Sequence, residues 1–342
     1  MKAAPDVTWD SLDWRALDRL RAGFLDGQAA QGPYWKSPHD LAAYDLTYGE
    51  RIGWKWDAVL RELRLRSWAP APASAGLVVL DWGCGSGIAG RRVIAAIGPE
   101  KVSRLLLWDH SPLAVAYAVE RARSAFPGLT VDAASGPSTA SDVLVVSHVL
   151  NEIPPAQLSD FRSLLTATRS LLWVEPGTHE VSRSLQQWRE HLLADGAHLV
   201  APCTHQGSCG LLRAGEERHW CHHFAPPPVG VHADRHWVRF AQRAGIDLRS
   251  LPYAFVIAER TASSAPFPAG AARLIGRPEH FKPYARTLSC DAAGVTEVTL
   301  PRRTLPDLYK HLERNRGPLL YRWERQDNTV TAGESLIPLG SS

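Results

Sequence analysis

The stretch LDWGCGSGIAG, residues 80–90, decides the fold class of this 342-residue chain. The apolar run LVVLDW, residues 77–82, has the length and composition of a buried strand, and a helical pattern starts at Gly87. Gly83, Gly85 and Gly87 lie where missing side chains let backbone amides approach a ligand, and the helix dipole attracts its anionic part. The stretch therefore predicts a ligand-binding turn in an α/β domain.

Strand-like and helix-like segments continue to alternate after this turn. RLLLWD and DVLVVSHVL have the pattern of buried strands, and SLLWVEPG follows as another. PLAVAYAVERARSAF and PAQLSDFRSLLTAT, which lie between them, have helical spacing of their apolar residues. This alternation predicts a parallel sheet with helices on both faces.

The patterns predict three parts of the chain. Residues 1–75 are expected to form an N-terminal helical cap that ends in the linker APAPASAG. Residues 76–262 are expected to form the α/β domain, with a cysteine-bearing insertion at about 177–228. Residues 271–330 contain the candidate strands ARLIGRP, YARTLSCD and GVTEVTLP and the candidate helix LPDLYKHLERN, which indicate a small β-rich region.

Two acidic residues flank the glycines in the pattern of a nucleoside-binding site. Asp81 precedes the glycines, and Asp109 ends the next strand, where a ribose needs an acceptor for its two hydroxyls. This combination resembles the seven-stranded S-adenosylmethionine-dependent methyltransferases and implies their Rossmann-like sheet. Nicotinamide enzymes more often show G-x-G-x-x-G, and a purely structural turn is the other alternative. The resemblance implies that S-adenosylmethionine is bound by Asp81, Gly83, Gly85, Gly87 and Asp109.

The segment SHVLNEIP, residues 147–154, ends the fourth strand of this series, at the edge that faces the transferred methyl group in the fold. Its polar residues His148, Asn151 and Glu152 are therefore the candidate catalytic residues. The D/N-P-P-Y/F signature of many amino-group methyltransferases is missing here. A structural role, in which Asn151 and Glu152 cap a helix that begins near Pro154, is the alternative.

Four of the five cysteines form a candidate metal or cluster site, since thiolates bind soft metals and iron–sulfur clusters. Their spacing, C-x5-C-x11-C and then 68 residues to the last, matches neither zinc ribbons nor the ferredoxin pattern. A zinc site could also recruit His205, His222 or His223. Unrelated buried thiols are the remaining alternative, and Cys84 is expected only to pack under the glycine turn. The four candidate ligands are Cys203, Cys209, Cys221 and Cys290.

The segments VEPGT, LVAPCTHQGSC and HWCHHF carry a second resemblance. They are similar to a methyltransferase-like family that associates with the small ribosomal subunit in mitochondria and bacteria, over residues 77–325. The resemblance implies that the four cysteines ligate a [4Fe–4S] cluster and that the partner is small-subunit rRNA. Thr204 and Gly210 stand where the family usually has proline, and His223 interrupts its W-C-H-F pattern.

Three functions are compatible with these residues. The first is a cluster-containing, S-adenosylmethionine-binding methyltransferase-like protein that acts on rRNA or in assembly of the small ribosomal subunit. The second is a non-catalytic assembly scaffold with a vestigial donor site. The third is a small-molecule methyltransferase with a structural zinc site.

Charge is unevenly distributed along the chain, whose formal net charge is +3. Residues 273–325 contain 11 Lys and Arg against 6 Asp and Glu, which favours a surface that faces a polyanion. We expect one positive surface formed by Arg273, Arg277, Lys282, Arg286, Arg302 and Arg303. No apolar stretch reaches membrane-spanning length, and the N-terminal MKAAPDVTWDSLDW resembles no targeting segment, so a cytoplasmic protein is expected.

Overall fold

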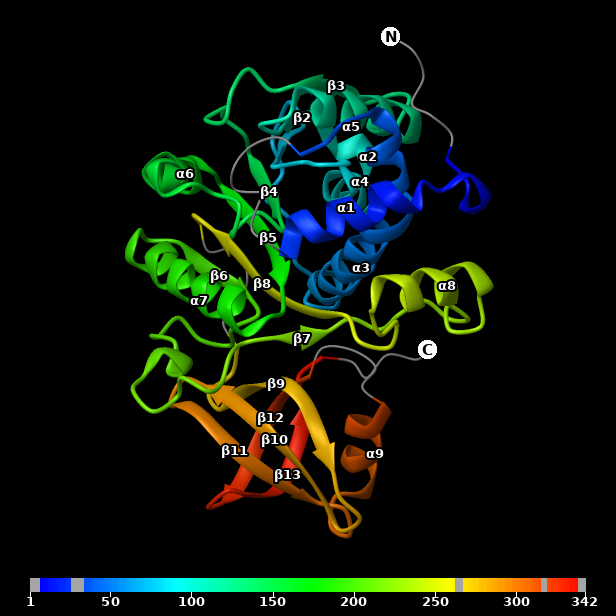
Figure 1. The fold of residues 1–342 in the computed structure, drawn as a ribbon. Helices are drawn as coiled ribbons and strands as arrows, with labels where there is room; N and C mark the ends of the chain where they lie inside the picture. Colours follow the sequence, from blue (N-terminus) through cyan, green and yellow to red (C-terminus); the bar gives the residue numbers. More distant parts are fainter. Residues whose placement is uncertain (1–6, 26–33, 262–266, 315–318, 338–342) are drawn as a thin grey trace. The chain divides into compact units, whose positions relative to one another are not determined.

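The structure is a computed structural model that describes residues 7–25, 34–261, 267–314 and 319–337 (Figure 1). It divides into two compact units, each assembled from separate stretches of the chain. The first unit comprises 1–60, 69–174 and 227–251; the second comprises 61–68, 175–226 and 252–342. The domain boundaries expected from the sequence stay a prediction. None of the described helices is both long enough and apolar enough to cross a membrane.

The first unit is built on parallel strands in the order β3-β2-β1-β4-β5. The central strands are apolar and nearly fully buried, as expected for a sheet that is covered on both faces. Each pair is in parallel register, as in the pairing of Asp81 with Leu107 and Val145. The strands are β1 (Leu77–Trp82), β2 (Val102–Trp108), β3 (Thr130–Ala133), β4 (Val143–Ser147) and β5 (Ser170–Pro176).

Helices connect these strands and cover the sheet. Helices α4 (Ile88–Ile97) and α5 (Pro112–Ala125) lie on one face, and α6 (Leu158–Ala167) lies on the other (Figure 1). The start of α5 is well specified, because the Ser111 side chain accepts a hydrogen bond from the Ala114 amide and proline occupies the first turn. The predicted alternation of strands and helices is confirmed.

The N-terminal segment adds a further layer of helices to the first unit. Leu20, Leu41 and Ala42 pack with Ala114 and Tyr117 of α5 in one buried cluster. The elements are η1 (Trp9–Ser11), α1 (Trp14–Leu25), α2 (Pro38–Tyr44), the π-helical turn η3 (Asp45–Gly49), α3 (Glu50–Leu65) and, later in the chain, α8 (Arg235–Ala244).

The second unit starts with a helix and short antiparallel strands. Strand β8 pairs antiparallel with both β6 and β7. The elements are α7 (His179–Ala194), β6 (His198–Ala201), η6 (Gly210–Leu212), β7 (His223–Phe224) and β8 (Pro252–Glu259).

A closed five-stranded barrel completes the second unit, with the strand order β10-β11-β13-β12-β9. Strands β11 and β13 run parallel, whereas the other neighbours are antiparallel. Helix α9 closes the barrel core, where Tyr309 and Leu312 pack against Leu274, Val298 and Leu300. The elements are β9 (Ala271–His280), β10 (Tyr284–Asp291), β11 (Gly294–Pro301), α9 (Pro306–Arg314), β12 (Leu320–Gln326) and β13 (Thr329–Ser335).

This barrel confirms the expected β-rich C-terminal region and extends it. The first three strands and the helix were predicted from the sequence, whereas β12 and β13 were not. Their segments LYRWERQ and TVTAGES are largely charged or polar on the exposed side, so they lack a long apolar run.

Candidate functional site

The glycine turn between β1 and α4 requires glycine at specific positions. Gly83 has φ +69°, and a Cβ atom there would lie 2.4 Å from Cγ1 of Val149. Gly87 has φ +76°, and its Cβ would lie 2.9 Å from Cβ of Ala118. Left-handed backbone and close packing together exclude side chains at both positions. The turn therefore exposes backbone rather than side chains at the start of α4, as the sequence predicted.

Asp109 closes this turn from the end of β2. Its Oδ2 atom accepts a hydrogen bond from the Gly85 amide at 2.9 Å, and its Oδ1 atom accepts one from the Ser111 amide at 2.8 Å. Burial raises the pKa of Asp109, although these two amides oppose that shift. Each carboxylate oxygen keeps a second lone pair. Asp109 therefore lies beside the glycine turn. Its contact with a ribose stays a prediction.

Asp81 has a different environment. It is fully buried, and its Oδ2 atom accepts a hydrogen bond from the Gly90 amide of α4 at 2.9 Å. Burial raises the pKa of this carboxyl to about 7. A Cβ atom on Gly90 would lie only 2.7 Å from Oδ2, so glycine lets the helix approach the carboxyl. Asp81 thus holds α4 against β1 and thereby stabilises the glycine turn.

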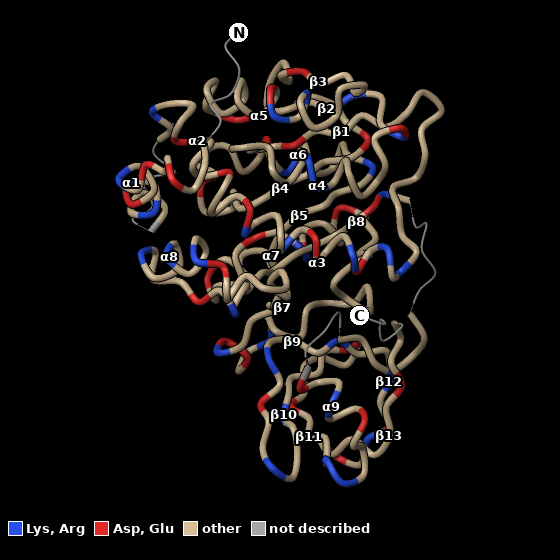
Figure 2. Tube along the Cα trace, turned by 90° about the vertical axis from the view of Figure 1, so that its right-hand side faces the viewer, with Lys and Arg blue, Asp and Glu red and all other residues tan. Residues whose placement is uncertain are grey.

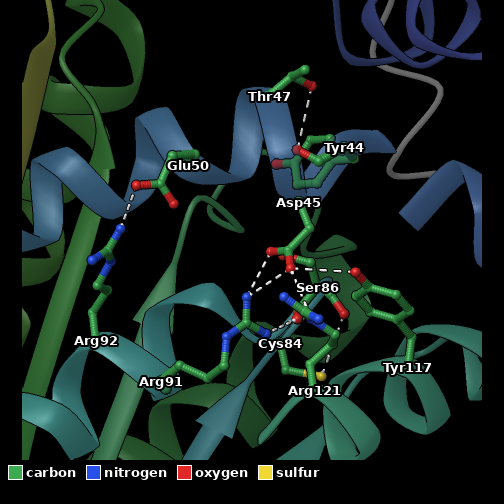
Figure 3. A network of polar contacts seen from close by, with 12 residues as sticks. Tyr44, Asp45, Thr47, Glu50, Cys84, Ser86, Arg91, Arg92, Tyr117 and Arg121 are labelled. Atoms are coloured by element: carbon green, nitrogen blue, oxygen red, sulfur yellow. Dashed lines mark hydrogen bonds and ion pairs between the residues drawn. The ribbon is translucent and has the colours of Figure 1, made fainter. Parts of the chain in front are cut away.

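Asp45, at the start of η3, is a second residue that stabilises the glycine turn. The sequence did not indicate this role. Both carboxylate oxygens of Asp45 accept hydrogen bonds from Arg91, at 2.7 and 2.8 Å. Arg91 also donates to the Ser86 carbonyl at 2.7 Å, and Tyr117 donates to Asp45 at 3.3 Å (Figure 3). A π-helical turn often marks a functional position. Because Asp45 lies about forty residues upstream of the turn in the printed sequence, no local pattern predicts this contact.

His148 follows β4 with a left-handed backbone, φ 57°, which is uncommon for a residue other than glycine. Its Nε2 atom lies 3.1 Å from Nζ of Lys55, and its Nδ1 atom lies 3.3 Å from Oγ of Ser147. Trp56 donates a hydrogen bond to the same Oγ at 2.9 Å. Burial, and then the charge of Lys55, lower the pKa of His148 well below its usual value. The imidazole is therefore neutral at neutral pH.

The other two predicted catalytic residues differ in their surroundings. Asn151 is exposed, whereas Glu152 is half-buried and accepts a hydrogen bond from the Tyr34 hydroxyl at 3.5 Å. The helical turns that follow start after Pro154 and Gln157, so neither Asn151 nor Glu152 occupies an N-cap position. The alternative of a capping role is wrong, because the chain makes a further turn before the first helix begins.

The four candidate ligand cysteines line one cavity of the second unit, together with Arg189 of α7. Cys203 follows β6, and Cys290 belongs to β10, so the cavity brings together distant parts of the sequence. Burial raises the pKa of Cys221 well above its usual value, and the neighbouring thiols Cys203, Cys290 and Cys209 raise it further. Arg189 donates to Sγ of Cys203 at 3.4 Å. The arrangement supplies thiols whose ionisation needs a compensating cation.

The three candidate histidines differ in their position relative to the cysteine cavity. His205 lines the same cavity, and Nε2 of His223 lies 3.7 Å from Sγ of Cys221. His222 instead stacks on Trp220, with ring centroids 4.5 Å apart. Among the residues that the structure describes, no three His, Cys, Asp or Glu side chains are grouped closely enough for a single metal ion.

The expected positive surface is wrong for Arg273, whereas two further members lie beside partners that the sequence did not indicate. Arg273 is buried, and it binds Glu62 through bonds of 2.6 and 2.8 Å. Arg277 lies over the ring of Phe224 at 4.1 Å. Arg286 is paired with Glu279. The charge count of the region could not reveal these contacts, since each partner is placed by the fold.

Comparisons with solved structures find methyltransferases. Magnesium protoporphyrin IX methyltransferase from Synechocystis PCC 6803 with bound SAH is 14% identical over 74% of this chain and 97% of that one, with a TM-score of 0.39. The 16S rRNA methylase RmtB is 15% identical over 56% and 70%, with a TM-score of 0.34. The CurJ carbon methyltransferase is 12% identical over 74% and 62%, with a TM-score of 0.35.

The comparison with family models is more specific. No curated protein matches the chain at a significant level. The model described as mitochondrial small ribosomal subunit Rsm22 matches residues 100–310, which are more than half of the chain. This match includes the four candidate cysteines and confirms the resemblance seen in their segments. The chain therefore belongs to the family of the mitochondrial small ribosomal subunit protein Rsm22.

Proposed function

We propose that the protein binds S-adenosylmethionine and transfers its methyl group to rRNA of the small ribosomal subunit. The observation that carries this proposal is the position of Asp109 beside the glycine turn. Its Oδ2 atom accepts a hydrogen bond from the Gly85 amide at 2.9 Å. An acid held beside such a turn suits a ribose, because a carboxylate accepts two hydroxyl donors at once. Family membership supports the small subunit as the site of action.

Different residues in and around the turn would bind or position different parts of the donor. The amides at the start of α4 favour the anionic carboxylate of the methionine part. Asp109 would take the ribose hydroxyls with its free lone pairs. Asp81 and Asp45 would act indirectly, since one holds α4 and the other holds Arg91 and thereby the Ser86 carbonyl.

Methyl transfer breaks the bond between sulfur and the methyl carbon, forms a bond from that carbon to the acceptor, and releases a proton from the acceptor. Glu152 is the anionic member of the three predicted catalytic residues and would accept this proton. His148 is kept neutral by burial and by Lys55, so it would orient the acceptor through hydrogen bonds rather than by charge. The exposed Asn151 would contribute an amide to the same edge.

We further propose that Cys203, Cys209, Cys221 and Cys290 hold a [4Fe–4S] cluster. The support is that all four line one cavity, where burial and then the neighbouring thiols raise the pKa of Cys209, Cys221 and Cys290, so their thiolates need a cationic group nearby. A cluster takes each cysteine on a different iron, so its ligands are more widely spaced than those of a single ion. When bound, it would supply a structural link between the cysteine segment and β10.

The decisive experiment measures methyl transfer from labelled S-adenosylmethionine to 30S particles, to naked rRNA and to a metabolite extract. Incorporation into either rRNA substrate, lost in Asp109→Ala, supports the proposal. Donor binding without incorporation into any substrate would instead favour the assembly scaffold. Incorporation only into a metabolite would favour the small-molecule enzyme. Iron, sulfide and zinc analysis of anaerobically purified protein tests the cluster, and zinc without iron would contradict it.

A further inference from the structure

The barrel of the second unit has the strand connectivity of an OB fold. In chain order its strands are β9, β10, β11, β12 and β13, and their order around the barrel is first, second, third, fifth, fourth. The third and fifth strands meet in parallel at Thr299 and Thr329, and helix α9 lies between the third and fourth. Barrels of this type bind oligonucleotides and oligosaccharides on the face of strands two and three and on adjacent loops. Since a fold alone does not define a function, the surface must supply the chemistry.

Two loops at one end of the barrel carry cations without acidic partners. Lys282 lies in the turn between β9 and β10, and Arg302 and Arg303 follow β11. All three are exposed, and none forms an ion pair with any residue that the structure describes. Figure 2 shows blue stretches on the loops at the end of the barrel beyond β10, β11 and β13.

Three arginines on the barrel strands are different, because carboxylates neutralise them. Arg286 is paired with Glu279, Arg322 is paired with Glu334, and Arg325 is paired with Asp291. Lys282, Arg302 and Arg303 therefore differ from these three arginines in having no carboxylate partner among the described residues.

Hydrogen bonds hold the two loops together. The Arg302 amide donates to the Pro283 carbonyl at 2.9 Å, and the Phe281 amide donates to the Tyr284 carbonyl at 2.8 Å. Tyr309 of α9 donates to the Phe281 carbonyl at 2.9 Å, while its ring lies beneath the Arg302 guanidinium at 5.2 Å. These contacts fix the loop backbones before any ligand binds, which reduces the entropy lost on binding.

An aromatic surface adjoins these cations. Phe281 is 38% exposed, although large apolar side chains are normally buried. Its ring centroid lies 4.8 Å from that of Tyr284, at an interplanar angle of 32°. Unpaired bases stack on exposed aromatic rings beside a cationic path for the backbone, whereas a duplex keeps its bases inside.

We propose that this end of the barrel, formed by Phe281, Lys282, Tyr284, Arg302 and Arg303, binds single-stranded RNA. The choice of RNA rests on the proposed function, since the partner of the methyltransferase site is rRNA. The three cations would contact successive phosphates, and Phe281 would stack on a base. The site differs from the donor site in residues and in chemistry, so each can fail without the other.

The test measures binding of the full-length protein to a fluorescent oligo-uridine of about 16 nucleotides, the upper site size of one OB fold. Replacing Lys282, Arg302 and Arg303 together with glutamine should flatten the log–log salt dependence of affinity by about two units, at roughly 0.7 per contact. Phe281→Ala should weaken binding by roughly ten-fold and leave the salt slope unchanged. The matched control is Arg322→Gln, which removes an exposed but paired arginine of the same barrel and should bind like the parent.

Several results would overturn the proposal. These are parent-like binding by the triple variant, equal losses in Arg322→Gln, and tighter binding of an A·U duplex than of the single strand. Melting temperatures of all variants identify any that misfold, and Phe281→Tyr, which keeps the ring, should restore binding. If the barrel variants bind oligo-uridine like the parent and the protein still methylates 30S particles, only the barrel proposal fails. If the parent binds no donor but oligo-uridine binding depends on these residues, only the methyltransferase proposal fails.

Discussion

Nζ of Lys55 lies 3.1 Å from Nε2 of His148, so a residue of helix α3 contacts the end of strand β4. His148 has a left-handed conformation, with φ 57°. Trp56, the neighbour of Lys55, fixes Ser147 through a hydrogen bond of 2.9 Å. Left-handed residues other than glycine cost free energy and are typical of functional sites. Two adjacent residues of α3 therefore shape the edge where the candidate catalytic residues lie.

His148 should make stability fall in mild acid. Its pKa is lowered in the folded state, first by burial and then by Lys55, whereas the unfolded chain takes up the proton near pH 6.5. Below that pH the unfolded state binds more protons, so the free energy of unfolding decreases as pH falls. His148→Asn should remove this decrease, and asparagine tolerates the left-handed backbone. Urea unfolding of parent and variant at pH 5 and pH 8 measures the difference.

The same experiment on Lys55→Met separates the two causes. Loss of the ammonium charge should weaken the acid sensitivity only partly, because burial is the larger cause. An unchanged difference between the two pH values in His148→Asn would show that other groups produce it.

Asp81 should have the opposite effect on stability at higher pH. Its folded pKa of about 7 exceeds the ordinary value, so the folded state keeps a proton that the unfolded chain loses. Stability should therefore fall as pH rises from about 4 to about 7, by a contribution on the order of 4 kcal/mol. Asp81→Asn should flatten this dependence, since the neutral amide oxygen can still accept the Gly90 amide. Calorimetric melting of the parent and of Asp81→Asn across this pH range measures how their stability changes with pH.

Asp81→Leu is the control for the hydrogen bond itself. It removes both the titration and the acceptor, so the Gly90 amide is left buried without a partner at a cost of about 1–3 kcal/mol. If Asp81→Asn keeps the pH dependence of the parent, the buried carboxyl is not its source.

Gly83 should be irreplaceable even by alanine. A Cβ atom at φ +69° is strained, and it would lie 2.4 Å from Cγ1 of Val149. We expect Gly83→Ala to destabilise the fold by about 2–4 kcal/mol and to abolish donor binding. Gly128→Ala is the matched control, because nothing lies within 4 Å of its Cβ position. The double variant Gly83→Ala/Val149→Ala should recover only the steric part, and full recovery would show that the backbone conformation costs nothing.

The sequence predicted the parts of the fold that depend on local pattern. Buried strands such as LVVLDW are continuous apolar runs, and the turn after them needs glycine for steric reasons that hold in any context. Strands β12 and β13 were missed because polar and charged residues interrupt their apolar residues, although Tyr321 is almost fully buried inside the barrel.

The contacts that support the candidate sites were not predictable for a different reason. Asp45 and Arg91, like Glu62 and Arg273, are far apart in sequence, and only tertiary packing brings them together. A charged residue in a sequence gives no indication of its partner, so the arginine count overestimated the free positive surface. The cysteines were selected as candidates because their residue type is rare in this chain and their chemistry is specific, and their role as ligands stays a prediction.

The cysteine cavity gives the last prediction. If all four thiols share one cluster, removal of any one should release iron, because one iron of the cluster then lacks its protein ligand. Cys290→Ser should lose iron and lower the melting temperature as much as Cys203→Ser, although 86 positions separate them in the printed sequence. The reason is that Cys290 belongs to β10, so the cluster would tie the barrel to the cysteine segment.

Cys84→Ser is the matched control, because this buried cysteine lies in the glycine turn of the first unit and should leave iron content unchanged. Iron and sulfide are measured on anaerobically purified protein, together with visible absorbance and melting temperature. If Cys290→Ser keeps full iron while Cys203→Ser loses it, the fourth ligand is another group. His223→Ala then becomes the discriminating variant, since its Nε2 atom lies 3.7 Å from Sγ of Cys221. Loss of iron in His223→Ala but not in Cys290→Ser would replace the four-cysteine site by a site of three cysteines and one histidine.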